Sequence, residues 1–369
     1  MFKITEVPFR LKIAQDILAL GTETRLKISF TRGGRLFSLE PEGSVGGLPD
    51  FYEHAISFLR KKNGFSPSVI TFDPHPLFCC FSQAQEFKNI FFKNARLAPV
   101  FHHLAHVARF GLEKGSRTKF IGVAFDGTGY GVDKKAWGSE FFVYDRKKFI
   151  RRAHFDYMAL PGSDAAINEP WRIALAMVVK AFGPARGYDF LKNVRKEKIK
   201  IVRQMLAKKF NVAYSSGAGR LFDAFASIIG VKDAVALEEK AKKANGAVTA
   251  FSFDINKGDS GILCVDFIPT LSEVLSSGRT FLKDKIARMF HKTVAEASCR
   301  VLRILKKEHG IKDVFLSGGV FSNDILCSDM RKILKEDGFN LFFDKRPLNT
   351  DLGISEGQIA AVCMGNICA

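Results

Sequence analysis

One pattern of strands and turns occurs twice in this chain, and it limits the folds that the chain can adopt. In the first copy, residues 16–39 contain an apolar strand that runs into Gly-Thr-Glu, a second strand, a Gly-Gly turn and a third strand. In the second copy, residues 120–154 contain an apolar strand that runs into Asp-Gly-Thr-Gly, a second strand, a basic turn and a third strand. Short apolar runs separated by such turns are typical of hairpins. The repeat predicts a duplicated βββα unit in an α/β protein.

The Gly-rich turns of the two copies also suggest a function. Backbone N–H groups at such turns can point at an anion without obstruction by a Cβ atom. Two turns that face each other therefore predict a phosphate clamp. Asp126, where the second copy enters its turn, is either an ordinary Asp-Gly turn residue or a carboxylate that binds a metal beside the phosphate.

The remaining segments predict more helices than strands. The first copy is followed by a helix at Leu48–Lys61 and a strand at Val69–Asp73. Near the C-terminus, a buried strand runs into Ser317-Gly318-Gly319, and Ser322 or Asn323 can cap the helix that follows. Helical periodicity is also present at Ile173–Phe182, Tyr188–Phe210, Gly219–Ile229, Asp233–Ala244, Thr280–Leu305 and, after a strand at Leu341–Phe343 and a connection at 346–351, Ile354–Met364.

Composition sets the broad class of the chain. Its 369 residues are 47% hydrophobic and 25% charged, which is typical of a globular protein with two ordinary domains or one large one. The apolar runs are too short to span a bilayer, and the first residues do not resemble a signal peptide. The seven Cys include no Cys-x-x-Cys pair. We therefore expect a cytoplasmic protein with reduced thiols and no membrane association.

A net charge of +18 raises the question of a polyanionic partner. The densest basic segment, residues 195–209, has helical spacing with an apolar stripe that includes Ile201, Val202, Met205 and Leu206. No zinc knuckle, RNP motif or aromatic-interleaved basic strand accompanies it. The pattern favours a solvated helix face over a nucleic-acid site, and tRNA stays among the alternatives.

Three histidines lie within five residues, at positions 102, 103 and 106. On a helix that begins after Pro99, His102 and His106 are one turn apart and share a face, so both imidazoles can reach one ion. His103 points elsewhere. The alternative is a helix with partly exposed histidines that bind nothing. Asp351, taken alone, is the N-cap of the last helix.

Several motifs, taken together, resemble the HypF family of carbamoyltransferases, which act in nickel–iron hydrogenase maturation. The resemblance extends in order from about residue 16 to residue 361. It covers the C-terminal core of that family, the part similar to TsaD. The matching stretches are Asp126–Gly131, Trp137-Gly138 with Glu140-Phe141, Leu160–Ala166, Glu169–Arg172, Gly219–Ala224, Phe290-His291 with Thr293, Leu316–Phe321 with Asn323, and Gly357-Gln358.

The resemblance implies an actin/hexokinase/Hsp70-like fold, which agrees with the duplicated βββα pattern. We expect a first actin-like half at residues 1–117 and a second at 118–369. The second half would carry a mainly helical insertion at about 165–297, and the C-terminal helix would pack back across the cleft.

The resemblance also implies a set of site residues. A divalent metal, iron or zinc, would be bound by His102, His106, Asp126 and Asp351. His/Asp ligation by itself permits either metal, or manganese. ATP or carbamoyl-adenylate would be bound by Gly127, Thr128, Gly129, Arg220, Asp223, Gly318, Gly319 and Asn323.

The implied reaction is carbamoyl transfer from carbamoyl-adenylate to the C-terminal Cys thiolate of a HypE-like protein. The acylphosphatase, zinc-finger and YrdC-like regions of full-length HypF have no counterpart in this sequence, so a separate YrdC-like protein would supply the adenylate. The chain departs from the family pattern at Val45–Leu48, Lys232–Ala236 and Thr350–Gly353. Two alternatives follow: a carbamoyltransferase for another acceptor, a small-molecule hydroxyl or tRNA, and a non-catalytic nucleotide-binding remnant.

Overall fold

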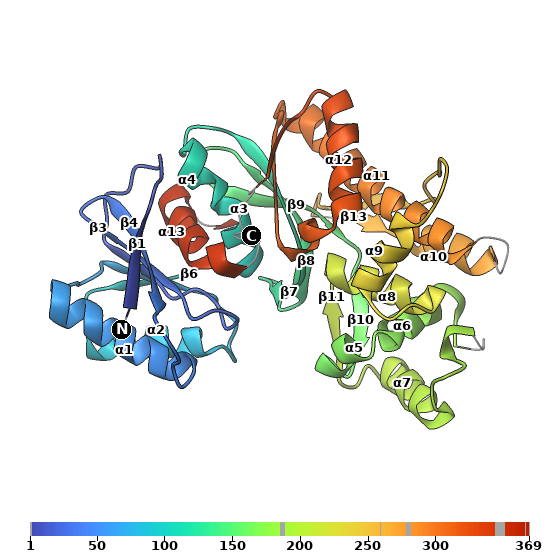
Figure 1. Cartoon of the computed structure of the whole chain (residues 1–369), viewed down its shortest axis with the longest axis horizontal. Coiled ribbons are helices and arrows are strands. Elements are labelled where there is room, and N and C mark those ends of the chain that lie inside the picture. Colours follow the sequence, from blue (N-terminus) through green and yellow to red (C-terminus); the bar gives the residue numbers. More distant parts are fainter. Residues whose placement is uncertain are drawn as a thin grey trace.

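The computed structural model describes residues 2–184, 189–258, 260–277, 282–343, 351–365 and 367–368. The chain is built around two β-sheets, one from the N-terminal third and one from the rest (Figure 1). Each sheet has its own large apolar cluster, and a third cluster lies between the sheets. The position of that third cluster decides where the site lies.

The first sheet has six strands in the order β1-β4-β3-β2-β5-β6. Helix α1 (Leu48–Asn63) follows the third strand of the repeat, and it ends where Gly64 takes a left-handed conformation with φ 57°. Helix α2 (Cys79–Ile90) connects β5 to β6. The strands are β1 (Phe2–Val7), β2 (Ile17–Ala19), β3 (Ile28–Arg32), β4 (Arg35–Pro41), β5 (Val69–Phe72) and β6 (Arg96–Pro99).

The second sheet has ten strands, seven of which follow the path β12-β13-β9-β8-β7-β14-β15. The three others pair at its margins, β10 with β11, β11 with β8, and β16 with β9. The strands are β7 (Phe120–Tyr130), β8 (Ala136–Tyr144), β9 (Phe149–Phe155), β10 (Met158–Pro161), β11 (Val212–Ser215), β12 (Asp254–Lys257), β13 (Leu263–Asp266), β14 (Asp313–Ser317), β15 (Asn340–Phe343) and β16 (Ile367–Cys368).

The two sheets contain the same five-strand unit. In the first sheet its order is β4-β3-β2-β5-β6, and in the second it is β9-β8-β7-β14-β15. In both units the first three strands in sequence pair antiparallel, and the last two join in parallel. The predicted duplication and the actin-like fold class are confirmed.

The layer between the sheets consists of helices α3 (His102–Ala108), α4 (Phe110–Lys114) and α13 (Ile354–Met364). Figure 1 shows α13 beside α3 and α4, next to the first sheet, although α13 is the last helix of the chain. Gly357 allows this approach, because a Cβ atom there would lie 2.0 Å from the Ala105 carbonyl oxygen. The C-terminal segment is thus held against the histidine-bearing helix.

The middle of the chain is largely helical, and helices are found near each predicted segment. Two boundaries differ from the prediction by four residues or more. The helix predicted over Tyr188–Phe210 is shorter, because the chain first forms a 3-10 turn at Asp189–Leu191, whose Leu191 packs against Val202 of the helix. Tyr188 lies outside the described residues. The helices are α5 (Asp164–Asn168), α6 (Trp171–Phe182), α7 (Lys196–Lys208), α8 (Ala218–Ile229), α9 (Ala234–Lys242), α10 (Ile268–Ser276), α11 (Lys283–His309) and α12 (Asp324–Glu336).

The second differing boundary is the end of α11, which continues past the predicted Leu305 to His309 and ends at Gly310 with φ 66°. Residues 280 and 281, at its predicted start, and the connection at 346–350 lie outside the described residues. The periodicity also did not indicate β11, β12 and β13, short strands that extend the second sheet. Within the described part of the chain, no helix has the length and apolar character needed to cross a membrane.

The predicted turn at Asp126–Gly129 is wrong. The chain continues as strand through this segment, and the register of β7 on β8 shifts between Phe125 and Gly129. The hairpin closes later, where Gly131 donates to the Lys135 carbonyl oxygen at 2.9 Å. The glycines therefore form an irregular stretch within a strand, which turns Asp126 toward the layer between the sheets.

Candidate metal centre and nucleotide pocket

Helix α3 brings two histidines to one point. Pro99 ends β6, Phe101 is the extended N-cap residue, and the helix begins at His102. His102 and His106 lie one turn apart, and their ring centroids are 4.9 Å from each other. Both side chains are buried, in contrast to the alternative of partly exposed histidines.

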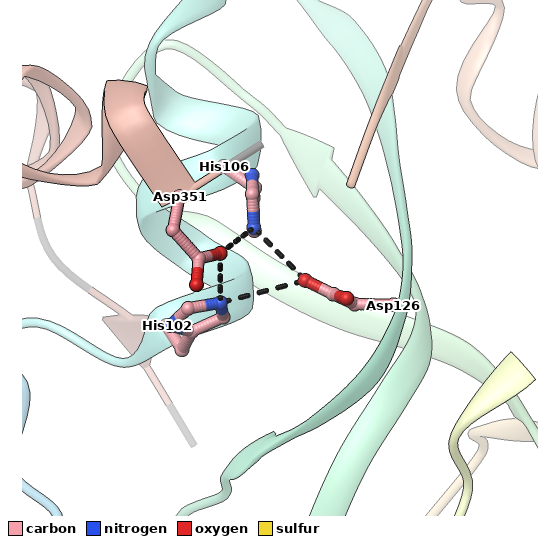
Figure 2. A group of neighbouring side chains, drawn as sticks. All are labelled: His102, His106, Asp126 and Asp351. Carbon is pink, nitrogen blue, oxygen red and sulfur yellow. Dashed lines mark hydrogen bonds and ion pairs between the residues drawn. The ribbon is translucent and has the colours of Figure 1, made fainter. Parts of the chain in front are cut away.

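Two carboxylates from distant elements complete the cluster (Figure 2). Asp126 comes from β7 and Asp351 from the 3-10 turn η4 (Asp351–Gly353). His106 Nε2 lies 3.2 Å from Asp126 Oδ2, and His102 Nε2 lies 3.3 Å from Asp351 Oδ1. One ligand atom from each of the four residues lies within 4.8 Å of all the others. The four predicted ligands are therefore brought together.

Each histidine has an outer partner at its second nitrogen. Asp73 Oδ2 lies 3.5 Å from His102 Nδ1, and Ser317 Oγ lies 3.3 Å from His106 Nδ1. The Nε2 atoms of both rings are thereby directed toward Asp126 and Asp351. A carboxylate behind a histidine is common around metal ions in proteins, because it fixes the ring and raises its basicity. Asp73 was not predicted as a site residue, although its place directly after a buried parallel strand was a usable signal.

The electrostatics of the cluster follow from its burial. Burial alone lowers the pKa of His102, but hydrogen bonds to Asp126, Asp351 and Asp73 outweigh it and hold the pKa well above its usual value. Burial alone raises the carboxyl pKa values of Asp126 and Asp351, and the two histidines nevertheless hold both below their usual value. The carboxylates are therefore ionised beside an imidazolium.

These donors fit a divalent cation. A metal ion would replace the positive charge of the His102 imidazolium, and its binding would release the proton from that ring. Two imidazole nitrogens and two carboxylate oxygens suit zinc, iron or manganese. His103 does not belong to the set. It is fully buried against Gly129, and burial followed by the charge of His102 lowers its pKa to about 3.

A pocket of about 270 Å³ opens on the other side of Asp126. Four residues predicted to bind the nucleotide line it, namely Gly127, Arg220, Gly319 and Asn323. The other lining residues are Asp126, Gly219, Phe222, Ala234, Val235, Glu238, Val320 and Ser322.

Four other predicted residues lie around this pocket without lining it. Thr128 is exposed, and Gly129 lies against His103. Asp223 forms an internal ion pair with Arg220 at 3.2 Å. Gly318 has φ 103° and packs on Phe125, where a Cβ atom would lie 2.3 Å from the carbonyl oxygen.

Glycines bring the N-terminus of α8 against β7. A Cβ atom at Gly217 would lie 2.2 Å from the Gly127 carbonyl oxygen, and one at Gly219 would lie 3.1 Å from Gly127 Cα. Glu140, fully buried on β8, accepts a hydrogen bond from Ser216 Oγ at 2.6 Å and holds this junction in place. A helix N-terminus with Arg220 in its first turn provides positive charge at the pocket wall, which suits an anion.

Asp126 connects the cluster and the pocket. Its Oδ2 faces the histidines, and its Oδ1 accepts the Gly127 N–H at 2.7 Å. Asn323, by contrast, is largely occupied within the protein. Its Oδ1 caps α12 by accepting the Leu326 N–H, and its Nδ2 donates to His291 Nε2 at 3.0 Å.

The first Gly-rich turn is hydrogen-bonded to helix α13. The Gly21 N–H donates to Gln358 Oε1 at 2.9 Å, and Gln358 Nε2 donates to the Gly21 carbonyl oxygen at the same distance. Among the described residues, those that line the pocket come from the second half of the chain. The Gly21 N–H is therefore not available to an anion, and the phosphate clamp of two facing turns stays a prediction.

The repeated five-strand unit, with α3 and α13 between its two copies, defines an actin-like α/β protein. Two solved structures have this fold along nearly the whole chain. Full-length HypF in its phosphate- and nucleotide-bound form superposes with a TM-score of 0.84 at 28% identity, over 97% of this chain and 57% of that one. HypF of T. kodakarensis gives 0.83 at 27% identity, over 97% and 49%.

Residues 12–113 match the HypF Kae1-like domain, and residues 122–358 match the second subdomain of the carbamoyltransferase Kae1-like domain. The chain belongs to this Kae1-like family of HypF carbamoyltransferases. Carbamoyltransferase HypF2 of Cupriavidus necator is 28% identical over 95% of this chain and 47% of its own length. A HypF homolog of the same organism is 29% identical over 93% of this chain and 90% of its own length.

The chain thus spans about half the length of several curated relatives, with 47% of each covered. These relatives are named carbamoyltransferase HypF, or a probable one in Methanocaldococcus jannaschii.

Proposed function

We propose that this chain is a carbamoyltransferase core that binds ATP or carbamoyl-adenylate in the α8 pocket, next to a metal ion at the His/Asp cluster. The observation that carries the proposal is the position of Asp126. One of its oxygens faces His106 at 3.2 Å, and the residue also lines the pocket. A nucleotide in the pocket would therefore lie beside the ion, which is the arrangement that carbamoyl transfer from a mixed carbamic–phosphoric anhydride needs.

The pocket residues account for anion binding. Arg220 and the N–H groups at the start of α8 would face the phosphate, and the absence of a side chain at Gly127 and Gly319 allows its oxygens to approach the backbone. The full-length HypF structure that this chain resembles is a phosphate- and nucleotide-bound form. We infer that the same pocket takes the nucleotide here.

His102, His106, Asp126 and Asp351 would hold iron or zinc. When bound, the ion would polarise the carbamoyl carbonyl and stabilise the charge that develops on its oxygen. The chain's own residues would orient the adenylate and exclude water from the buried cluster. Asp73 and Ser317 would keep both imidazole rings in the binding orientation.

The nucleophile would come from the acceptor. Burial raises the thiol pKa of each of the six cysteines whose side chains the structure describes, to about 12 at Cys264 and about 11 at Cys327 and Cys363. These thiols therefore stay protonated near neutrality. We propose that the C-terminal Cys thiolate of a HypE-like protein attacks the carbamoyl carbon. A carbon–sulfur bond forms, the bond from that carbon to the adenylate oxygen breaks, and AMP leaves. A YrdC-like protein would supply the adenylate in trans.

The test is mass spectrometry of a HypE-like acceptor after incubation with the metal-loaded form of this chain and with carbamoyl-adenylate. We expect a carbamoyl mass increase on the terminal Cys-containing peptide and none with the acceptor Cys→Ala variant. An unchanged mass, while nucleotide and metal are demonstrably bound, would reject this acceptor.

A second candidate is carbamoyl transfer to a hydroxyl, with tRNA as the acceptor that one observation favours. Helix α7 exposes Lys196, Lys198, Lys200 and Lys208, and Phe210 just beyond it is 70% exposed. Salt-sensitive binding of tRNA would be the first requirement of this alternative. If the chain binds nucleotide and modifies neither acceptor, the remnant hypothesis is the better account.

A further inference from the structure

The turn between β2 and β3 is attached to the segment that carries Asp351. Lys27 Nζ donates to the Leu352 carbonyl oxygen at 2.9 Å and to Glu356 Oε1 at 2.8 Å. Ser29 and Ser355 share a hydrogen bond of 2.8 Å between their hydroxyls. Together with the paired amide contacts of Gly21 and Gln358, these bonds join residues 21–29 to residues 352–358.

This attachment is buried and charged. The exposed fraction is 6% at Lys27, 7% at Arg109 and 2% at Glu356. Arg109 Nε donates to Glu356 Oε2 at 3.1 Å, so that carboxylate has a cation on each oxygen. Removing one partner of such a buried pair leaves an uncompensated charge. The first turn and the start of α13 therefore hold each other in one relative position.

Asp351 lies at the end of this attachment. Its Oδ2 accepts a hydrogen bond from Thr24 Oγ1, and its Oδ1 faces His102 at 3.3 Å and His106 at 3.7 Å. The two oxygens of one carboxylate are thus divided between the first turn and the candidate metal centre. The next residue, Leu352, is held through its carbonyl by Lys27.

We propose that Thr24 and Lys27 are positioning residues for the metal centre, through which the first half of the protein sets the orientation of the ligand Asp351. Thr24 fixes the rotation of the carboxylate, and Lys27 fixes the backbone just after it. The inference rests on the proposed metal site. It gives a function to the first Gly-rich turn, which does not line the pocket. In this proposal the turn supports a metal ligand, and residues of the second half bind the phosphate.

The experiment compares Thr24→Val with Thr24→Ser in the full chain, using Co²⁺ as the probe. Thr24 is exposed, and valine matches threonine in shape, so folding should be unaffected. Loss of the outer hydrogen bond should weaken Co²⁺ binding by about 10- to 100-fold in chelator competition, the usual cost of removing such a partner. It should also change the Co²⁺ visible spectrum. The serine variant keeps the hydroxyl and should restore both.

Thr5→Val, at an exposed position of β1 in the same sheet, is the matched control and should bind Co²⁺ as the unchanged protein does. Lys27→Gln tests the second contact and should weaken Co²⁺ binding as well. If the unchanged protein binds Co²⁺ and the valine and serine variants have equal Co²⁺ affinity and spectra, the positioning role of Thr24 is rejected. The proposed metal centre is not rejected by that result. A chain that binds no Co²⁺ at all would reject the metal centre and this inference together.

Discussion

The two copies of the strand–turn–strand unit have the same place in their sheets and different surroundings. In the first copy, the turn after β2 is occupied by α13, through the amide of Gln358 on Gly21. In the second, β7 continues as an irregular strand and presents Asp126 to both the histidines and the α8 pocket. The duplicated topology therefore does not imply duplicated chemistry. One copy supports a ligand-bearing segment, and the other forms the walls of the site.

The largest effect is expected from removing a histidine of the candidate metal centre, which both copies help to form. His106→Ala should abolish stoichiometric metal binding and reduce carbamoyl transfer by at least about 100-fold, because a metal that polarises the carbonyl contributes several kcal/mol. Elemental analysis and single-turnover transfer measure the two effects. His54→Ala, at an exposed position of α1, is the control. Full activity in a metal-free His106→Ala protein would contradict the proposed role of the cluster.

A pair of glycine substitutions separates the two copies. Gly217→Ala places a methyl group 2.2 Å from the Gly127 carbonyl oxygen, so the start of α8 must move. We expect a stability loss of about 1–3 kcal/mol and weaker binding of an ATP analogue. Gly21→Ala, with φ 76° and the Lys27 carbonyl 2.8 Å away, should instead weaken Co²⁺ binding and spare the nucleotide.

Denaturant unfolding, Co²⁺ competition and analogue titration check these two variants side by side. Gly258→Ala, where the added methyl group meets its nearest atom at 3.7 Å, serves as the control. Equal effects of Gly21→Ala and Gly217→Ala on nucleotide affinity would break the comparison, because the first copy would then contribute to the pocket after all.

Much of the fold followed from local patterns in the sequence, and the interior contacts did not. The repeat of strands and turns predicted the two related sheets, since side-chain alternation and Gly-rich turns are local properties. The spacing of His102 and His106 likewise predicted one helical face. Asp126 was expected in a turn, because Asp-Gly is usually a turn signal, and pairing with β8 kept it in a strand.

The contact partners of the site came from residues hundreds of positions apart. Lys27 and Glu356 are one case, and Thr24 and Asp351 are another. Neither pair has a periodicity or motif of its own, so no pattern within one segment could reveal it. Family resemblance supplied the four candidate ligands but gave no account of Asp73, whose role depends on where β5 ends relative to α3.

A smaller effect is expected from the outer partner of His102. Asp73→Asn removes the negative charge behind the imidazole and keeps the shape of the side chain. Metal affinity should fall by about 10- to 100-fold, as for other carboxylates behind a ligand histidine. Co²⁺ competition measures this, and Asp145→Asn, in the β8–β9 turn, is the control. Undiminished affinity would show that Ser317 and the helix alone orient the ring pair.

The smallest expected effect is a pH dependence confined to the second half. His291 is fully buried, and burial lowers its pKa to about 4. It is held neutral between the Ala287 carbonyl and Asn323 Nδ2. The unfolded chain takes up this proton near pH 6.5, so the contribution to stability is complete above that pH and is lost as pH falls toward 4.

Between pH 7.5 and 6.0 this residue should account for a loss of about 1 kcal/mol in the free energy of unfolding. Urea unfolding of the unchanged protein and of His291→Gln at both pH values isolates it, because His103 and His154 contribute equally to both proteins. If the free energy of unfolding changes equally with pH in both proteins, neutral His291 does not contribute to the stability.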